Sequence, residues 1–131
     1  MKEKMPKLTP PEIRIMKAVW IQDGQSLTEI LEKVNDAAQK SFNRSTLNMQ
    51  LLRLLKKGWL TQSQKGNRLF YSATVSEEDA SFEIVNDVKK QLFGGSCLDL
   101  VKALLSKDNQ ISKEEIVQIR EMINDFEDKT K

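Results

Sequence analysis

The hydrophobic pattern of the chain changes its period at Gly58, and this change restricts the fold more than any other feature. Before Gly58, apolar residues recur at spacings of three and four in three successive segments, a pattern typical of amphipathic helices. After it, residues 59–63 and 68–73 are predicted strands, joined by a turn at residues 64–67. Because an isolated hairpin is only marginally stable in water, we expect it to pack against the three helices.

Each of these three helices begins with a recognisable capping residue. Thr9 and Ser26 are each followed by a glutamate three positions later, which is the arrangement of a capping box. They predict helices at about residues 10–21 and 27–38. Asn43 is the predicted cap of the third helix, because its side chain can accept a hydrogen bond from the first turn. The apolar stripe of that helix consists of Leu47, Leu51, Leu54 and Leu55.

The second half of the chain is predicted to form three further helices. Ser76 is the predicted cap of a helix that runs to about residue 93, a short helix is expected at about 97–105, and Ser112 caps the last helix. A segment of this length is usually too small to bury a core alone, so we expect its apolar residues to meet a second copy of the chain. The predicted dimerisation residues are Phe82, Val85, Val88, Leu92, Ile116, Ile119, Ile123 and Phe126.

The predicted fold class is therefore mainly α. A winged helix-turn-helix DNA-binding domain, made of three helices plus a β-hairpin wing, is expected at residues 1–75. A helical dimerisation domain of three helices is expected at residues 76–131.

The net charge of +2 conceals a strong asymmetry between the two halves. Residues 1–75 carry 13 Lys and Arg against six Asp and Glu, whereas residues 76–131 carry eight against 13. Acidic residues are absent between Asp36 and Glu77. An uninterrupted basic segment of this kind suits a polyanion such as DNA. Its seven cations are Lys40, Arg44, Arg53, Lys56, Lys57, Lys65 and Arg68.

The outward face of the third predicted helix has the composition of a recognition helix. Small polar residues lie at its N-terminal end and cations lie further along, so the first can reach base edges while the second meet phosphates. A polar outer face is also ordinary for a surface helix, so the prediction depends on the acid-free segment and the basic hairpin around it. The predicted DNA-binding residues are Asn43, Arg44, Ser45, Thr46, Asn48, Met49, Arg53 and Lys56, with Lys65 and Arg68 from the hairpin.

Side-chain chemistry predicts individual roles for some of these residues. Thr46 and Met49 suit a thymine methyl group, and Asn48 suits adenine. Arg44 suits guanine or a phosphate. The two cations of the hairpin tip would touch flanking phosphates or the minor groove.

Histidine is absent from the chain and only one cysteine is present. This composition excludes Ser–His and Cys–His catalysis, histidine-containing metal sites and a disulfide within the chain. We therefore expect no enzyme activity, no metal and no cofactor, and Cys97 is expected to be a small buried residue. No apolar run is long enough to span a membrane, and the charged start leads into no apolar stretch, so a cytoplasmic location is expected.

Three blocks of the sequence carry a resemblance to a known family. Residues 8–20 follow the pattern L-(S/T)-x-x-E-x-x-(I/V)-M-x-x-(V/I/L)-W. They resemble the opening of the penicillinase-repressor family of winged-helix regulators, the BlaI/MecI/CopY group. Residues 45–47 and 51–60 resemble that family's recognition helix and the strand after it, and residues 68–76 resemble its wing. The resemblance covers nearly the whole chain.

The resemblance implies a homodimeric repressor of transcription. Its N-terminal winged helix would bind a palindromic operator, and its C-terminal helices would dimerise. It also implies control of a β-lactam-resistance operon or a related stress operon through a membrane sensor protease. That protease would cut the chain within residues 89–93.

The sequence departs from the family pattern in three places that bear on function. One is the expected cut site at residues 89–93, where the family's usual residues are not plainly present. Asn43-Arg44-Ser45-Thr46 stands where the family often has Ser-Pro-Lys-Thr, so a different operator sequence is expected. The copper-responsive members carry paired cysteines near the C-terminus, whereas this chain has none there, so copper sensing is not expected.

Two other functions remain open at this point. The first is a ligand-sensing winged-helix regulator with a small-molecule pocket between its two parts. The second is a helical protein-interaction adaptor whose basic face binds an acidic partner.

Overall fold

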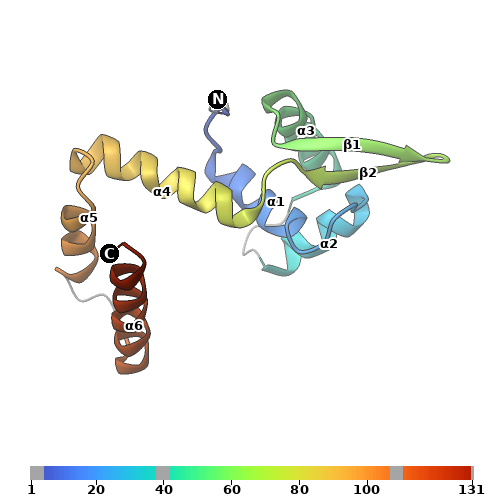
Figure 1. Ribbon diagram of the computed structural model, residues 1–131. Helices are drawn as coiled ribbons and strands as arrows, with labels where there is room; N and C mark the ends of the chain where they lie inside the picture. The colour runs from blue at the N-terminus through green and yellow to red at the C-terminus, as the bar shows by residue number, and fades with distance from the viewer. Residues whose placement is uncertain (1–4, 38–41, 107–110, 131) are drawn as a thin grey trace. The chain divides into compact units, whose positions relative to one another are not determined.

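The computed structural model describes residues 5–37, 42–106 and 111–130, and these ranges hold six helices and one β-hairpin (Figure 1). The predicted mainly α fold and the order of three helices, a hairpin and three helices are confirmed. The chain divides into two units, Met1–Asn86 and Asp87–Lys131, which we describe separately. This division falls within a helix, and the expected domain boundary after residue 75 stays a prediction.

α1 (Pro10–Val19) begins at the capping box that the sequence predicts. The Thr9 hydroxyl accepts a hydrogen bond from the backbone N–H of Glu12 at 3.3 Å, and the Glu12 carboxylate accepts one from the backbone N–H of Thr9 at 2.8 Å. Two backbone N–H groups at the helix start are thereby satisfied. α1 ends slightly before the expected position, where Trp20 donates its indole N–H to the backbone carbonyl of Val75 at 2.8 Å.

α2 (Leu27–Ala37) begins at the second predicted capping box. The Ser26 hydroxyl accepts from the backbone N–H of Glu29 at 3.3 Å, and the Glu29 carboxylate accepts from the backbone N–H of Ser26 at 3.0 Å. The expected last residue of this helix, Ala38, lies outside the described residues.

α3 (Arg44–Lys57) is capped at both ends as predicted. The side-chain oxygen of Asn43 accepts a hydrogen bond from the backbone N–H of Thr46 at 2.7 Å. At the other end, Gly58 has a φ of 91°, a left-handed conformation that glycine adopts without a steric penalty.

The core of the first unit lies between α1, α2, α3 and the hairpin. The predicted stripe of α3 is confirmed, since three of its four leucines are fully buried and Leu55 packs against them. Trp59 and Tyr71 bring the hairpin into the same core, because both are buried. Trp20 lies at its edge, partly buried, as the sequence predicts.

The hairpin consists of β1 (Leu60–Lys65) and β2 (Arg68–Ala73), which pair in an antiparallel register. The strand after α3 begins one position after Trp59, and the turn is shorter than predicted, because only Gly66 and Asn67 separate the strands. Gly66 has a φ of 62°, the kind of backbone conformation that two-residue hairpin turns require. Strand pairing therefore continues closer to the tip than the sequence predicts.

Gln25 forms an isolated β-bridge with Tyr71 of β2, in the segment between α1 and α2. Its backbone N–H donates to the carbonyl of Tyr71 at 3.0 Å, and the N–H of Tyr71 donates to the carbonyl of Gln25 at 2.7 Å. The Gln25 side chain is fully buried, and its amide donates to the backbone carbonyls of Ala18, Val19 and Gln22 at 2.8, 3.2 and 2.8 Å. One residue thus ties the wing to the end of α1.

The second unit contains the end of α4 (Glu77–Phe93), α5 (Cys97–Leu105) and α6 (Lys113–Lys129), close to the predicted bounds. Neither α5 nor α6 has a buried residue. The expectation that Cys97 is buried is wrong, since its side chain is exposed at the start of α5, where a single chain encloses no core. Within the described ranges, no helix has the length and apolar content needed to cross a membrane.

Candidate nucleic-acid interface

The ten predicted DNA-binding residues all have exposed side chains in the first unit. Eight belong to α3 and its cap, and two belong to the hairpin. The opposite side of α3 is anchored in the core by its buried leucines, so its outer face is held in a fixed orientation. The predicted basic segment contains two further cations, Lys57 and Lys40. Lys57 is described below, and Lys40 lies outside the described residues.

The N-terminal end of α3 is electrostatically unusual in this protein. Every other described helix has at least one acidic residue in its first turn, whereas α3 has none. The positive end of its dipole is therefore not neutralised locally and favours an external anion. Asn43 uses its side-chain oxygen as the helix cap, and Arg44 donates to the hydroxyl of Thr28 in α2 at 3.1 Å. These two bonds orient the first turn.

The C-terminal end of α3 is tied to the segment that begins α1. Nζ of Lys57 lies 2.7 Å from Oε1 of Glu12 and also donates to the backbone carbonyl of Lys7 at 3.0 Å. Burial alone would raise the pKa of Glu12, but the hydrogen bonds from Lys57 and Thr9 together outweigh it and lower that pKa below its ordinary value. Lys57 is therefore a structural cation, whereas Lys56, next to it, is exposed.

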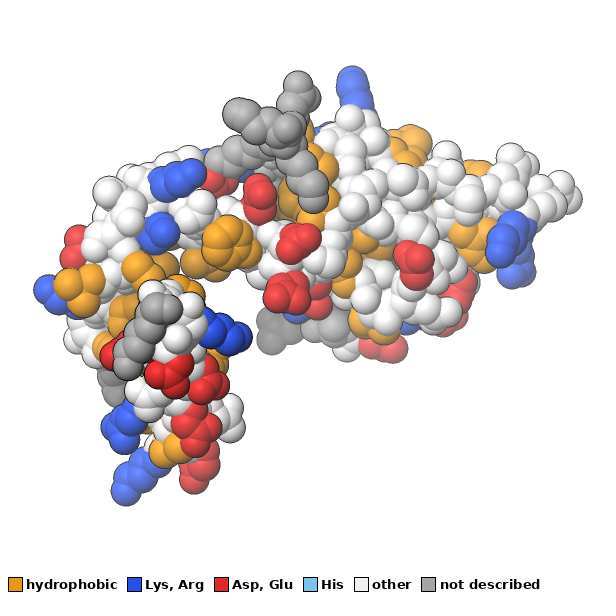
Figure 2. All heavy atoms as spheres, in the orientation of Figure 1, with side chains coloured by type: hydrophobic (Ala, Val, Ile, Leu, Met, Phe, Trp, Pro, Cys, Tyr) orange, Lys and Arg blue, Asp and Glu red, His pale blue; other side chains and the backbone are white. Residues whose placement is uncertain are grey.

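Two cations face each other at the tip of the wing. Lys65 and Arg68 are directly opposite in the strand register, and both are exposed. Figure 2 shows Lys and Arg side chains gathered near the end of the hairpin. Nζ of Lys65 also lies 5.9 Å from the centre of the Phe70 ring. Like charges directly opposite in a hairpin are destabilising, so this pair would be stabilised by an anion placed between them.

Gln25 is a functional candidate that the sequence analysis missed, because it sets the position of the wing relative to α1. The sequence shows only a glutamine directly before the capping Ser26, and nothing in the residues around it indicates that its side chain is buried. The Gln25 Oε1 atom is buried and has no hydrogen-bond partner among the described residues. The side chain is therefore held by the hydrogen bonds that its Nε2 atom donates to the carbonyls at the end of α1 and at Gln22.

The eight predicted dimerisation residues all have exposed apolar side chains in the single chain. Their exposed fractions run from 42% for Val88 to 73% for Leu92. In the second unit, α6 contributes the four predicted residues from Ile116 to Phe126, and the acidic residues Glu121 and Asp125 lie between them in the sequence. Such a density of exposed apolar side chains is typical of an interaction surface.

Comparison with known proteins identifies the family of this chain. A model of the penicillinase repressor family matches residues 8–125. The chain belongs to the penicillinase repressor family. The family predicted from the sequence is thereby confirmed, and it is a family of DNA-binding transcriptional repressors rather than of enzymes.

Individual relatives are distant but match along most of their length. The penicillinase repressor of Bacillus licheniformis is 23% identical over 129 residues, which cover 98% of each chain. An uncharacterised 16.5 kDa protein of Latilactobacillus sakei is 24% identical over 123 residues, 94% of this chain and 82% of that one.

Solved structures confirm the winged-helix fold. The DNA-binding domain of the repressor BlaI is 26% identical, with a TM-score of 0.50, and the match covers 60% of this chain and 93% of that domain. A MarR family protein from Bacillus stearothermophilus matches 95% of this chain and 76% of its own, with a TM-score of 0.53 and 15% identity. The second likeness concerns the fold alone.

Proposed function

We propose that this member of the penicillinase repressor family is a sequence-specific repressor that binds a palindromic operator as a homodimer. α3 would enter the major groove, and the hairpin would lie along flanking phosphates or the minor groove. One observation carries the proposal. The exposed face of α3 and the hairpin tip present cations from a stretch of sequence that contains no acidic residue.

The chemistry of the α3 face supports reading of base edges as well as binding of phosphate. Thr46 and Asn48 are exposed near the N-terminal end of the helix, where recognition helices contact bases. Arg53 and Lys56 are exposed further along, where they would meet the backbone. Met49, 55% exposed, offers an apolar side chain to a thymine methyl group.

The experiment that tests this proposal is an electrophoretic mobility shift on the DNA upstream of the protein's own gene, with random competitor DNA present. Retention at physiological salt that the competitor does not remove is expected. Weak binding that salt and competitor DNA abolish would show that the basic face binds DNA without sequence specificity, and would contradict a specific operator in this fragment. No binding at any salt, together with stable dimers, would favour the alternative of an adaptor that binds an acidic protein.

The dimer proposal rests on the exposed apolar residues of the second unit. Covering Ile119, Ile123 and Phe126 with a second copy would remove apolar surface from water, which is worth about 25 cal/mol for each Å². Light scattering at micromolar concentration should therefore give twice the mass of the chain. The variant Ile123→Asp should scatter as a monomer, whereas Ile21→Asp, on the first unit, should remain dimeric. A monomeric natural chain would contradict the proposal.

We also propose that a membrane sensor protease relieves repression by cutting the chain, as the family resemblance implies. The expected target, residues 89–93, forms the last turns of α4 and is followed by two glycines with positive φ, Gly94 and Gly95. A protease would have to unwind this end of the helix before cutting it. The prediction rests on the family alone, and so does the proposed β-lactam-resistance or stress operon.

A further inference from the structure

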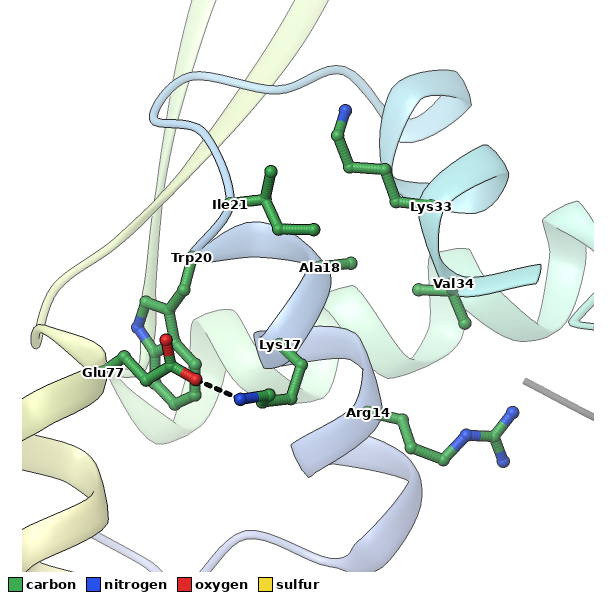
Figure 3. Close-up of a pocket in the computed structure, with 8 residues that line it drawn as sticks. All are labelled: Arg14, Lys17, Ala18, Trp20, Ile21, Lys33, Val34 and Glu77. Carbon is green, nitrogen blue, oxygen red and sulfur yellow. Dashed lines mark hydrogen bonds and ion pairs between the residues drawn. The ribbon is translucent and has the colours of Figure 1, made fainter. Parts of the chain in front are cut away.

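A hollow of about 400 Å³ lies in the first unit, and none of the ten predicted DNA-binding residues lines it (Figure 3). Its walls come from α1, the two residues that follow α1, α2 and the first residue of α4. This volume is within the range of pockets that hold small molecules. The hollow lies within the first unit, rather than between two parts of the chain as the ligand-sensing alternative assumed.

The charges around the hollow favour an anion. Lys17 of α1 forms an ion pair with Glu77, and Figure 3 shows this pair on one side, with Lys33 of α2 reaching over another side. Arg14 lies beyond Lys17 along α1, with its guanidinium 4.7 Å from the centre of the Phe42 ring. Three cations and one carboxylate line the space, and Glu29, one turn before Lys33 on α2, lies close enough to interact with that lysine. The surroundings keep a net positive charge, so a cationic ligand would be repelled and an anionic one attracted.

The remaining lining of the hollow is apolar. Ala18 and Val34 are almost fully buried and form its floor. Trp20 and Ile21 form its rim, and Ile21 is 67% exposed. An apolar group that covers Ile21 would remove the exposed surface of this side chain from water, which is favourable.

We propose that this hollow binds a small organic anion with an apolar body, the chemistry of an aromatic carboxylate. Its acidic group would lie beside Lys33, and its body would extend over Ala18 and Ile21 toward Lys17. Charge-assisted hydrogen bonds from Lys33 would fix the acidic end, the charge of Lys17 would add attraction at longer range, and the apolar rim would select against a small inorganic anion. The proposal goes beyond the proposed repressor function, because it does not involve α3 or the wing.

Glu77 gives the site a feature that a nonspecific apolar contact would not have. Its carboxylate neutralises the Lys17 ammonium, so it reduces the attraction of the hollow for an anion. Removing that carboxylate should therefore tighten binding, whereas removing a lysine should weaken it. Glu77 is also the first residue of α4, so the lining of the hollow includes the start of that helix.

The test uses 1-naphthoate as the probe and neutral 1-naphthamide as its matched control, with the full-length protein and no DNA. The two tryptophans provide a reporter and a reference. The indole N–H of Trp20 is bonded to Val75 beside the hollow, and that of Trp59 is bonded to the carbonyl of Pro6 elsewhere in the unit. Titration is followed by the shifts of both indole N–H signals in proton–nitrogen correlation spectra.

A saturable shift of the Trp20 signal with naphthoate, absent with naphthamide and absent from Trp59, is expected. Lys33→Gln and Lys17→Gln should each weaken binding about fivefold or more, and Glu77→Gln should strengthen it. Lys102→Gln, in α5, should have no effect. Equal shifts with both probes, or the same affinity in all four variants, would overturn the proposal whatever the protein does with DNA.

Discussion

Oε1 of Glu12 lies 2.7 Å from Nζ of Lys57, so a carboxylate that is only 1% exposed joins the start of α1 to the end of α3. The same carboxylate accepts a hydrogen bond from the backbone of Thr9. It therefore serves as a helix cap and as the partner of the cation that closes α3. The orientation of the proposed recognition helix depends on this contact.

Replacing Glu12 with glutamine should lower the free energy of unfolding by about 1–3 kcal/mol at neutral pH, because the buried ion pair is lost while Lys57 remains. Urea unfolding followed by circular dichroism measures the change. Glu29→Gln is the matched control, since Glu29 belongs to the other capping box but is not paired with a buried cation. Equal losses in the two variants would show that capping alone, and not the ion pair, is responsible.

The lowered pKa of Glu12 predicts a specific loss of stability in acid. The folded pKa lies below the ordinary value of 4.5, so the contribution is fully present above 4.5 and disappears as the pH falls below it through the folded pKa. The natural chain should lose stability in this window, and the Glu12→Gln chain should lose less. If the free energies of unfolding of the two chains fell by the same amount between neutral and acidic pH, the result would contradict this account.

Gln25→Met should destabilise the first unit by about 1–3 kcal/mol, because three backbone carbonyls lose a buried donor while the side-chain volume is nearly kept. Gln62→Met, on β1, is the control and should change stability little, because the Gln62 side chain is exposed and its amide makes only a long hydrogen bond, 3.5 Å, to the Tyr71 hydroxyl. Because Gln25 places the wing, Lys65→Ala should also cost less operator affinity in the Gln25→Met chain than in the natural chain. A double-mutant cycle measures this coupling, and strictly additive effects would count against a positioning role.

The base-contacting and phosphate-contacting residues of α3 should respond differently to truncation. Thr46→Ala and Asn48→Ala should cost about 1–3 kcal/mol on the operator and little on random DNA, because they remove contacts to base edges. Arg53→Ala and Lys56→Ala should weaken both kinds of DNA about equally. Competition binding with operator and random duplexes separates the two classes. If Thr46→Ala and Asn48→Ala weaken both duplexes alike, the assignment of base contacts is wrong.

The wing tip should show opposite effects on stability and on DNA binding. Lys65→Thr removes a like-charge repulsion across from Arg68 and introduces a residue that favours strands. The Lys65 contact with the Phe70 ring, at 5.9 Å, is at the outer limit for a cation–π interaction and is worth less, so stability should rise by about 0.2–1 kcal/mol. The same change should weaken DNA binding and reduce the dependence of log affinity on log salt by about one phosphate contact. Thermal unfolding and salt titrations measure the two effects. An unchanged salt dependence would place the tip away from phosphate.

The elements that could be predicted from the sequence are those whose signals are local. Thr9, Ser26 and Asn43 cap helices through residues three positions away, so their hydrogen bonds follow from a short stretch of sequence. The leucine stripe of α3 follows from helical periodicity in the same way. The eight candidate DNA-binding residues of α3 and its cap are exposed, as expected, because the other side of α3 was identified as core. Their contacts with DNA stay a prediction.

The features that sequence reasoning missed depend on contacts between distant segments. Gln25 pairs with Tyr71, 46 positions away, and nothing in the residues around Gln25 indicates that partner. The partner of Glu12 across the core, Lys57, was assigned only to the basic segment for the same reason. Cys97 was expected inside because cysteine is often buried, but its helix encloses no core within one chain.

Footprinting of the protein on the operator fragment tests the central claim most directly. Two recognition helices in successive major grooves should protect two half-sites whose centres are about 10 base pairs, or a multiple of that, apart. Lys56→Ala should weaken both protected regions together, and Ile123→Asp should remove the paired pattern. Protection of a single site by the natural chain, or uniform weak protection along the fragment, would contradict a dimeric repressor that reads DNA with α3.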